Sequence, residues 1–292
     1  MATSSLGPVL SATLVTPSLD HSIGAYCDFL HHHVQSRGVV SEAMARQWGQ
    51  TALAGAPVAW LANELDEAWL RLIEIPASEA VDPFRHSGWM SLEITVDDVD
   101  TLRSGMDESP FDIIGEPANL DVSDNIRAMQ VIGPAGEVLY LTEVKAEVPP
   151  FELPFARCTV DRLFIPVLLA SSRDQALEVY EQFPDTSGVT FETKITVINR
   201  ARQFDIDRRH PVATIQLRGS NLIEIDQLDG LSNRPLNSGA LPTGIAMITF
   251  EVVTIPNSID CFTMAEGIYA GRRTALLQGA TGELIELIET EP

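Results

Sequence analysis

The feature that most constrains this 292-residue chain is an internal repeat that divides it into two halves of similar length. The pentapeptide GEVLY at 136–140 returns as GELIE at 282–286, and Arg127 and Gly133 return at the same spacing as Arg273 and Gly279. Self-similarity at a fixed period indicates that one supersecondary unit is used more than once. Each half is therefore expected to build its own core and to be able to present its own site.

The repeat divides a second time. Four short strands share one pattern, and each closes a segment that reads strand, helix, strand, strand, strand: RLIE (71–74), YLTE (140–143), EIDQ (224–227) and ELIE (286–289). One such module cannot cover both faces of its own sheet, so the modules are expected to pair. The predicted fold class is therefore α+β, with four βαβββ modules forming two cup-shaped mixed-sheet domains.

A proline-rich stretch separates the predicted domains. The segment 148–159 begins VPPFELP, and its prolines disfavour both helix and strand. The first domain is accordingly placed at 1–147, the linker at 148–159 and the second domain at 160–292. The patterns further predict a first helix over 19–33, an extra helix over 41–48, a strand pair over 189–217 and a short fourth helix at 258–264.

Composition excludes several classes of partner. The formal net charge of −22 argues against nucleic acid and against an anionic membrane surface, because few basic groups are free to neutralise phosphates. No apolar run reaches the length that spans a bilayer. Three widely spaced cysteines and a start without a secretory leader indicate a cytoplasmic protein. The expected partner is a small molecule, and a homodimer is possible because such modules can pair between chains.

The module order resembles the vicinal oxygen chelate superfamily. Two features carry the resemblance: VDDVD at 96–100, which leads into a helix, and the G-E-x-x-x-L-x-E pattern that closes two modules. This superfamily includes glyoxalase I, bleomycin-resistance proteins, extradiol dioxygenases and methylmalonyl-CoA epimerase. The resemblance covers nearly the whole chain and implies paired βαβββ modules, with each pair enclosing one cavity.

In metal-using members of that superfamily, His, Gln or Glu ligands stand on the first and last strand of each module. The matching positions in this chain are Ser11, Arg71, Ser91 and Tyr140 in the first half, and Ile165, Glu224, Met247 and Glu286 in the second. None is a histidine, so the expectation is no metal and no other cofactor. The alternative is one divalent metal held by Glu224 and Glu286.

Arg71 and Tyr140 are the first catalytic candidates. Each interrupts an apolar strand, where a buried guanidinium needs a carboxylate or a bound anion. Arg71 would anchor a substrate anion, and Tyr140 would act as acid or electrophile with a pKa lowered by the neighbouring cation. Arg127 is expected to join them. The structural alternative pairs Arg71 with an internal carboxylate, with Glu74, Glu93 and Glu143 as candidates.

Glu224 and Glu286 are the second pair of candidates. If both point into one cavity, proximity and burial raise the pKa of one carboxyl and create a base that can abstract a C–H proton next to a carbonyl. A salt bridge from Arg273 to one of them is the structural alternative. Four further residues are predicted to contact substrate at or near the cavity: Ser11, Ser91, Trp89 and His86.

These candidates support two principal hypotheses. The first is a metal-independent enzyme of the lyase or isomerase type, acting on a compound that bears a carbonyl, a carboxyl or an aromatic ring. The second is a non-catalytic protein that sequesters an apolar small molecule. A divalent-metal-dependent dioxygenase or isomerase that uses Glu224 and Glu286 is a third possibility.

Overall fold

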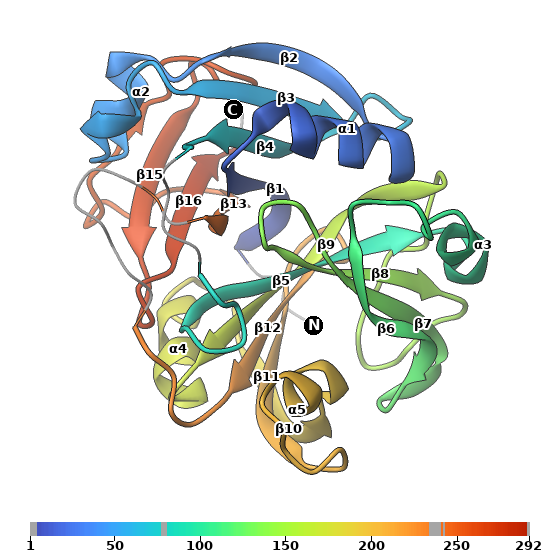
Figure 1. Ribbon diagram of the computed structural model, residues 1–292. Helices are drawn as coiled ribbons and strands as arrows, with labels where there is room; N and C mark the ends of the chain where they lie inside the picture. The colour runs from blue at the N-terminus through green and yellow to red at the C-terminus, as the bar shows by residue number, and fades with distance from the viewer. Residues whose placement is uncertain (1–4, 77–80, 234–240, 242, 291–292) are drawn as a thin grey trace.

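The computed structural model describes residues 5–76, 81–233, 241 and 243–290, and it contains two eight-stranded mixed sheets (Figure 1). The strands of the first sheet, in spatial order, are β14 (Phe262–Thr263), β15 (Arg273–Gln278), β16 (Leu284–Glu289), β13 (Gly244–Val252), β1 (Leu6–Thr16), β4 (Ala68–Glu74), β3 (Pro57–Ala62) and β2 (His33–Val39). Those of the second are β10 (Gly188–Lys194), β11 (Arg209–Gln216), β12 (Leu222–Gln227), β9 (Val160–Ala170), β5 (Gly88–Val96), β8 (Val138–Val144), β7 (Ser123–Ile132) and β6 (Asp112–Leu120).

Each sheet combines two modules of four strands, as the α+β prediction requires. Module one (β1–β4) joins module four (β13–β16) through antiparallel pairing of β1 with β13. Module two (β5–β8) joins module three (β9–β12) through antiparallel pairing of β5 with β9. We call the first sheet the terminal cup, because it contains the first and the last strand, β1 and β16, and the second the central cup.

This pairing differs from the predicted division into 1–147 and 160–292. The chain crosses between the cups after β4 and again after β12, whereas the proline-rich segment after β8 connects two modules of the same cup. Sequence patterns specify the interior of a module, but the partner of its first strand is chosen by long-range backbone hydrogen bonds that any side chain permits. The predicted sequential pairing was therefore wrong, although the four modules were recognised.

The predicted helices occupy the first connection of three modules. They are α1 (Leu19–Phe29), α3 (Val99–Ser104) and α4 (Arg173–Tyr180), and the side chain of an N-cap residue, Ser18, Asp98 or Ser172, accepts a backbone N–H at the start of each. The extra helix α2 (Glu42–Gln47) is confirmed and is followed by the short 3-10 helix η1 (Thr51–Leu53).

Two local predictions fail. The segment 189–217, expected to be strands alone, contains the helix α5 (Thr196–Ala201) between β10 and β11. In the described part of module four, 258–264 forms no helix, and its regular structure there is the two-residue strand β14. The six-residue helix α5 and the segment 258–264 are both too short for the periodicity of apolar residues to separate helix from strand.

The Gly-Glu turns that carried the sequence repeat join the two cups. Tyr26 on α1 donates its hydroxyl to Glu137 Oε1 at 2.7 Å, and Tyr180 on α4 donates to Glu283 Oε1 at 3.3 Å. All four side chains are buried. Each bond runs from the helix of one cup to the Gly-Glu turn of the other, so the repeated motif serves the interface between the cups.

The glycines of these turns leave room for the buried glutamates. A Cβ atom at Gly133 would overlap the carboxyl group of Glu137, and one at Gly279 would overlap that of Glu283. The space around each buried carboxylate therefore depends on the absence of a side chain at the glycine.

Among the helices of the described residues, none combines the length and the hydrophobicity of a membrane span.

Candidate functional site

The interior of the terminal cup holds a closed ion pair. Arg71 on β4 donates through an Nη atom to Glu286 Oε2 on β16 at 3.1 Å, and the two side chains are 2% and 0% exposed. Arg71 Nε also donates to Thr13 Oγ1 at 2.8 Å, and Thr249 Oγ1 donates to Glu286 Oε2 at 2.8 Å. Two residues that the sequence nominated for separate catalytic roles therefore satisfy each other.

Aromatic side chains close this cup over the ion pair. Trp48, the residue after α2, donates its ring N–H to Glu286 Oε1 at 3.0 Å, and its ring lies 4.6 Å from Arg71 Cζ. Trp60 on β3 lies 5.1 Å from the same carbon, and Tyr269 packs edge-on against Trp60. A buried guanidinium with one carboxylate, one hydroxyl and two aromatic faces has little capacity left for a substrate anion.

The central cup carries a different set of polar groups. Glu93 on β5 lies beside Tyr140 on β8 in the parallel pair and opposite Ile165 on β9 in the antiparallel pair. Glu224 on β12 lies beside Val167 of β9, two residues farther along that strand, so one strand separates the two glutamates. Asp226, two residues after Glu224, shares its face of β12. Tyr140 and Glu224 thus share a cup, as Arg71 and Glu286 do in the other.

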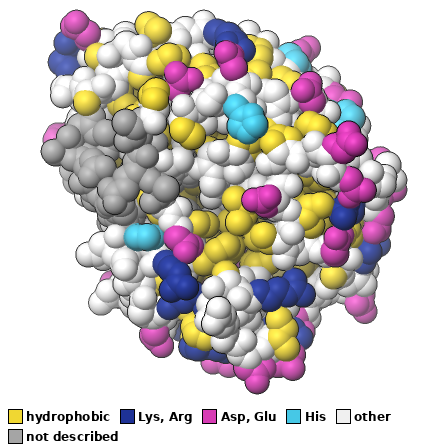
Figure 2. Space-filling model, in the orientation of Figure 1, with side chains coloured by type: hydrophobic (Ala, Val, Ile, Leu, Met, Phe, Trp, Pro, Cys, Tyr) yellow, Lys and Arg dark blue, Asp and Glu magenta, His cyan; other side chains and the backbone are white. Residues whose placement is uncertain are grey.

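Glu93 and Glu224 border an apolar cavity of about 360 Å³. Its other lining residues are almost all hydrophobic, and they include aromatic rings from three segments: Phe151 of the proline-rich stretch, Phe164 of β9 and Phe191 of β10. The proline-rich stretch, predicted to be an interdomain linker, therefore forms a wall of this cavity through Val148, Pro149, Pro150, Phe151 and Leu153. Figure 2 shows hydrophobic side chains gathered on this face of the molecule, in the region above α5.

Burial raises the pKa values of the carboxyl groups in the central cup. Burial, followed by the charge of Glu224, raises the pKa of Glu93 to about 8, while a hydroxyl of Thr142 at 3.4 Å gives limited compensation. Burial raises the pKa of Glu224 to about 7. Burial, and then the neighbouring Glu224 through its charge and a hydrogen bond between the two carboxyl groups, also raise the pKa of Asp226. Such a group holds shared protons at neutral pH.

The pKa of Tyr140 is shifted in the direction opposite to the predicted one. The guanidinium of Arg71, which was expected beside Tyr140, lies in the other cup. Burial and then the charges of Asp226, Glu93 and Glu224 raise the pKa of its phenol well above the ordinary value. The hydroxyl therefore keeps its proton at neutral pH, which suits it to donate a hydrogen bond and not to ionise.

The predicted substrate-binding residues lie outside this cavity or away from its acids. Arg127 forms two hydrogen bonds with Asp100 at 2.7 and 2.8 Å on the outer side of module two. Ser11 accepts the hydroxyl of Tyr269 in the terminal cup. Trp89 donates to Leu284 O and packs on Phe250 between the cups.

Ser91 and His86 were also predicted to contact substrate. Ser91 is fully buried on β5, and its hydroxyl finds no partner in the described structure. It lies two residues before Glu93, so it faces the same side of the sheet. His86 is half-exposed in the segment that crosses between the cups, with Nδ1 3.0 Å from Asp82 O. His86 does not line the apolar cavity.

Glu93 is the functional candidate that sequence reasoning placed only as a possible partner for Arg71. The count along β5 selected Ser91 as the inward position, and strand alternation gives both residues the same orientation. A carboxylate within the otherwise apolar run of β5 was the signal that could have found it, because a buried charge requires an explanation. Asp226, a buried carboxylate on β12, gives the same signal and was also missed.

The polar groups of both cups fit a transition metal poorly. Glu224 and Glu286 lie in different sheets, so the predicted two-carboxylate site does not form. In the described residues, the one group of three potential ligands with mutually close donor atoms is Asp98, Asp100 and Glu143. Asp98 is there the N-cap of α3 and Asp100 is paired with Arg127. Glu93, Glu224 and Asp226 do not meet that criterion, and no imidazole accompanies them.

No known sequence family and no curated protein matches the chain. Solved structures do. Glyoxalase I from Zea mays has a TM-score of 0.63 at 13% identity, over 96% of this chain and 92% of the maize chain. A Bacillus subtilis protein provisionally named a dioxygenase has a TM-score of 0.67 at 9% identity, over 100% of this chain and 87% of its own.

The chain has the vicinal oxygen chelate fold. The cppA protein from Streptococcus pneumoniae shares the arrangement, with a TM-score of 0.53 at 10% identity over 98% of this chain and all of that one. At such low identity, the likeness establishes a common architecture alone. The chemistry of this chain depends on the residues of its own two cups.

Proposed function

We propose that the central cup binds a small carbonyl compound with an apolar body and transfers a proton at the carbon next to the carbonyl, without a metal. Glu224 and Glu93 carry the reaction. The observation that supports this proposal is the placement of two carboxyl groups at an apolar cavity of about 360 Å³ to which the described residues contribute no cation. Cavities of this size suit small ligands.

The pair offers a base and an acid at the same pH. Glu224 has the lower of the two raised pKa values, so it is the member that loses its proton first, and Glu93 retains its own. Glu224 would accept the proton from the carbon, and Glu93 would donate its proton to the carbonyl oxygen, which yields an enol and reverses the charges of the two carboxyls. Return of a proton to carbon completes an isomerisation, while loss of a leaving group from the enol gives a lyase reaction.

Tyr140 would support the carbonyl group. Tyr140 lies on β8 beside Glu93, and its hydroxyl stays protonated at neutral pH. It can therefore donate a hydrogen bond to a developing enolate oxygen. Replacing Tyr140 by Phe is expected to reduce turnover and to leave ligand binding largely intact. Unchanged handling of every ligand would instead favour a binding protein.

The donor set supports metal independence. The positions that face one another in the central cup provide two carboxyls, one phenol and the apolar side chain of Ile165 or Val167. A site for iron, nickel or zinc in proteins ordinarily includes imidazole or thiolate ligands. Elemental analysis of protein purified without added metal tests this: one equivalent of Fe, Mn, Ni or Zn that Glu224→Gln removes would contradict the proposal.

The catalytic test uses an aryl ketone with exchangeable protons, methyl β-benzoylpropionate, in heavy water. Proton NMR would follow deuterium incorporation next to the ketone. We expect Glu224→Gln and Glu93→Gln each to lower the exchange rate about 10²–10⁴-fold, the range for removal of a general acid or base. Glu178→Gln on the exposed face of α4 provides the control. Binding of the ester without exchange by the unmodified protein would favour the sequestration hypothesis.

A further inference from the structure

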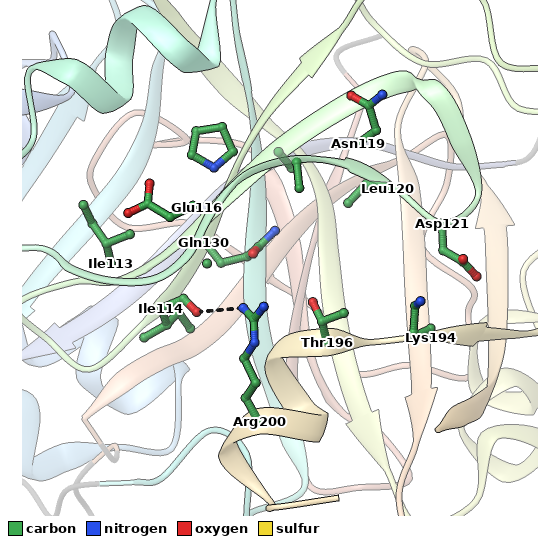
Figure 3. A pocket seen from close by; sticks show the side chains of 14 residues that line it. Ile113, Ile114, Glu116, Asn119, Leu120, Asp121, Gln130, Lys194, Thr196 and Arg200 are labelled. Carbon is green, nitrogen blue, oxygen red and sulfur yellow. Dashed lines mark hydrogen bonds between the residues drawn. The ribbon is translucent and has the colours of Figure 1, made fainter. Parts of the chain in front are cut away.

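A second cavity adjoins the apolar one and is bordered by charged and polar groups. It measures about 520 Å³ and lies between β6, β7 and the helix α5 (Figure 3). The two cavities share Leu120 as a lining residue. Gln130 of β7, which lines the second cavity, lies beside Tyr140 of β8 in the sheet. The second cavity therefore opens on the same cup as the acidic pair.

Four charged side chains line this cavity, and three are already compensated. Glu116 receives two hydrogen bonds from Arg103, at 2.7 and 3.0 Å. Lys194 lies 3.2 Å from Asp207, and Asp121 lies 3.0 Å from Arg209. Their charges therefore cancel locally.

Arg200 is the fourth charged group and lacks such a partner. Its guanidinium rises from α5 toward Ile114, and its one contact there is a long hydrogen bond of 3.4 Å to the Ile114 carbonyl (Figure 3). No carboxylate of the described chain lies within ion-pair distance of it. Arg200 is exposed, and it is the charged group lining this cavity that has no ion pair within the described chain.

Neutral polar groups accompany Arg200. Thr196 of the same helix and the amide of Gln130 line the cavity with it (Figure 3). Gly115 provides the room for that amide, because a Cβ atom at residue 115 would overlap Gln130 Oε1. The cavity thus combines one uncompensated cation, one hydroxyl and the amide side chains of Gln130 and Asn119, all of which can donate hydrogen bonds to an oxyanion.

We propose that Arg200 binds a carboxylate group of the substrate, so that the ligand of the central cup is an anionic keto acid whose apolar part and carbonyl extend toward Glu93 and Glu224. This inference rests on the proposed function and names its substrate class. A carboxylate is favoured over a phosphate because Arg200 supplies a single uncompensated charge, whereas a dianionic phosphate would face Glu116 and Asp121 with little excess positive charge. A guanidinium holds a carboxylate with two parallel hydrogen bonds.

The test compares β-benzoylpropionate with its methyl ester, which has the same ring and ketone but no negative charge. Dissociation constants would be measured by calorimetry for the unmodified protein and for Arg200→Gln. We expect the unmodified protein to bind the acid at least about tenfold more tightly than the ester, as one charge-assisted hydrogen-bonded pair allows. Arg200→Gln should remove this preference and leave the affinity for the ester unchanged.

Arg208→Gln is the matched control. Arg208 is an exposed arginine close to α5 that stacks on Phe204, and it does not line the cavity. It reports any general effect of lowering the positive charge near α5. Circular dichroism and thermal unfolding would establish that each variant folds, and Arg200→Lys should retain part of the preference.

The outcomes separate this inference from the proposed reaction. If the acid binds no more tightly than the ester, whether or not either binds measurably, or if Arg200→Gln behaves like Arg208→Gln, the carboxylate site is wrong. Deuterium exchange that still depends on Glu224 would leave the proposed reaction standing in that case. Preference for the acid that depends on Arg200, without exchange, would support the site and contradict the reaction.

Discussion

The two cups contain the same module twice, but they resolve their buried charges in opposite ways. In the terminal cup, Arg71 and Glu286 form an ion pair under two tryptophans. In the central cup, Glu93 and Glu224 border an apolar cavity with Asp226 next to Glu224, and no cation of the described residues forms an ion pair with any of the three. Duplication thus allows one copy to become a filled structural unit while the other keeps an open, costly arrangement of charges that a ligand can use.

The difference indicates where function should be sought. Opposite charges that neutralise each other lose their reactivity toward a substrate, whereas like charges in an apolar environment acquire perturbed pKa values. Module one pairs with module four, which brings Arg71 to Glu286. Module two pairs with module three, which brings Glu93 and Glu224 to one cavity. Three predictions would break or sharpen this contrast, beginning with the largest effect.

Removal of Arg71 should destabilise the protein strongly. Arg71→Met leaves Glu286 buried without its cation, and breaking a buried pair in this way costs about 3–5 kcal/mol. The double variant Arg71→Met, Glu286→Leu should recover most of that loss, because no uncompensated charge remains. Urea unfolding followed by tryptophan fluorescence would measure both. A single variant as stable as the unmodified protein would remove the structural role assigned to the pair.

Stability should fall as the pH rises through the neutral range. The pKa of Glu93 is raised to about 8, so the folded protein holds a proton that the unfolded chain, with an ordinary glutamate, releases near pH 4.5. The folded state therefore binds more protons between these values, and the free energy of unfolding declines as pH increases from about 5 to 8, by about 3 kcal/mol.

Glu93→Gln should make this decline shallower, since the amide does not titrate, and should leave the part that comes from the raised pKa of Glu224. Glu178→Gln should leave it unchanged, because that side chain is exposed on α4. Denaturation midpoints measured at several pH values provide the comparison. Equal slopes for the unmodified protein and Glu93→Gln would contradict the buried acidic pair. A metal bound there would reverse the trend, because deprotonation would then favour the folded state.

The smallest expected effect concerns the two bonds between the cups. Tyr26→Phe removes the 2.7 Å hydrogen bond to Glu137 and should lower the free energy of unfolding by about 1–2 kcal/mol. Tyr180→Phe removes the longer 3.3 Å bond to Glu283 and should cost less. Thermal unfolding of both variants would test the order. The reverse order would mean that the two interfaces are not the equivalents that the repeat implies.

Much of the architecture could be predicted from the sequence. The Gly-Glu turns, the helix caps and the alternation of apolar residues specified four modules and their fold, because turns and caps depend on local backbone chemistry. The site was less accessible. Ser91 and Glu93 point to the same side of β5, so alternation alone could not choose between them, and the short helix α5, which carries Arg200, gave no periodic signal.

The sequence by itself determined the module, its fourfold use and the absence of histidine from the inward strand positions. Only the tertiary structure decided which modules share a cup, and with that which charges meet. The reason is physical: a module is built from contacts between near neighbours in the chain, whereas β1 meets β13 through backbone hydrogen bonds between residues more than 200 positions apart, which many side chains would allow. The tertiary pairing therefore placed Glu286 with Arg71 and left Glu224 with Glu93.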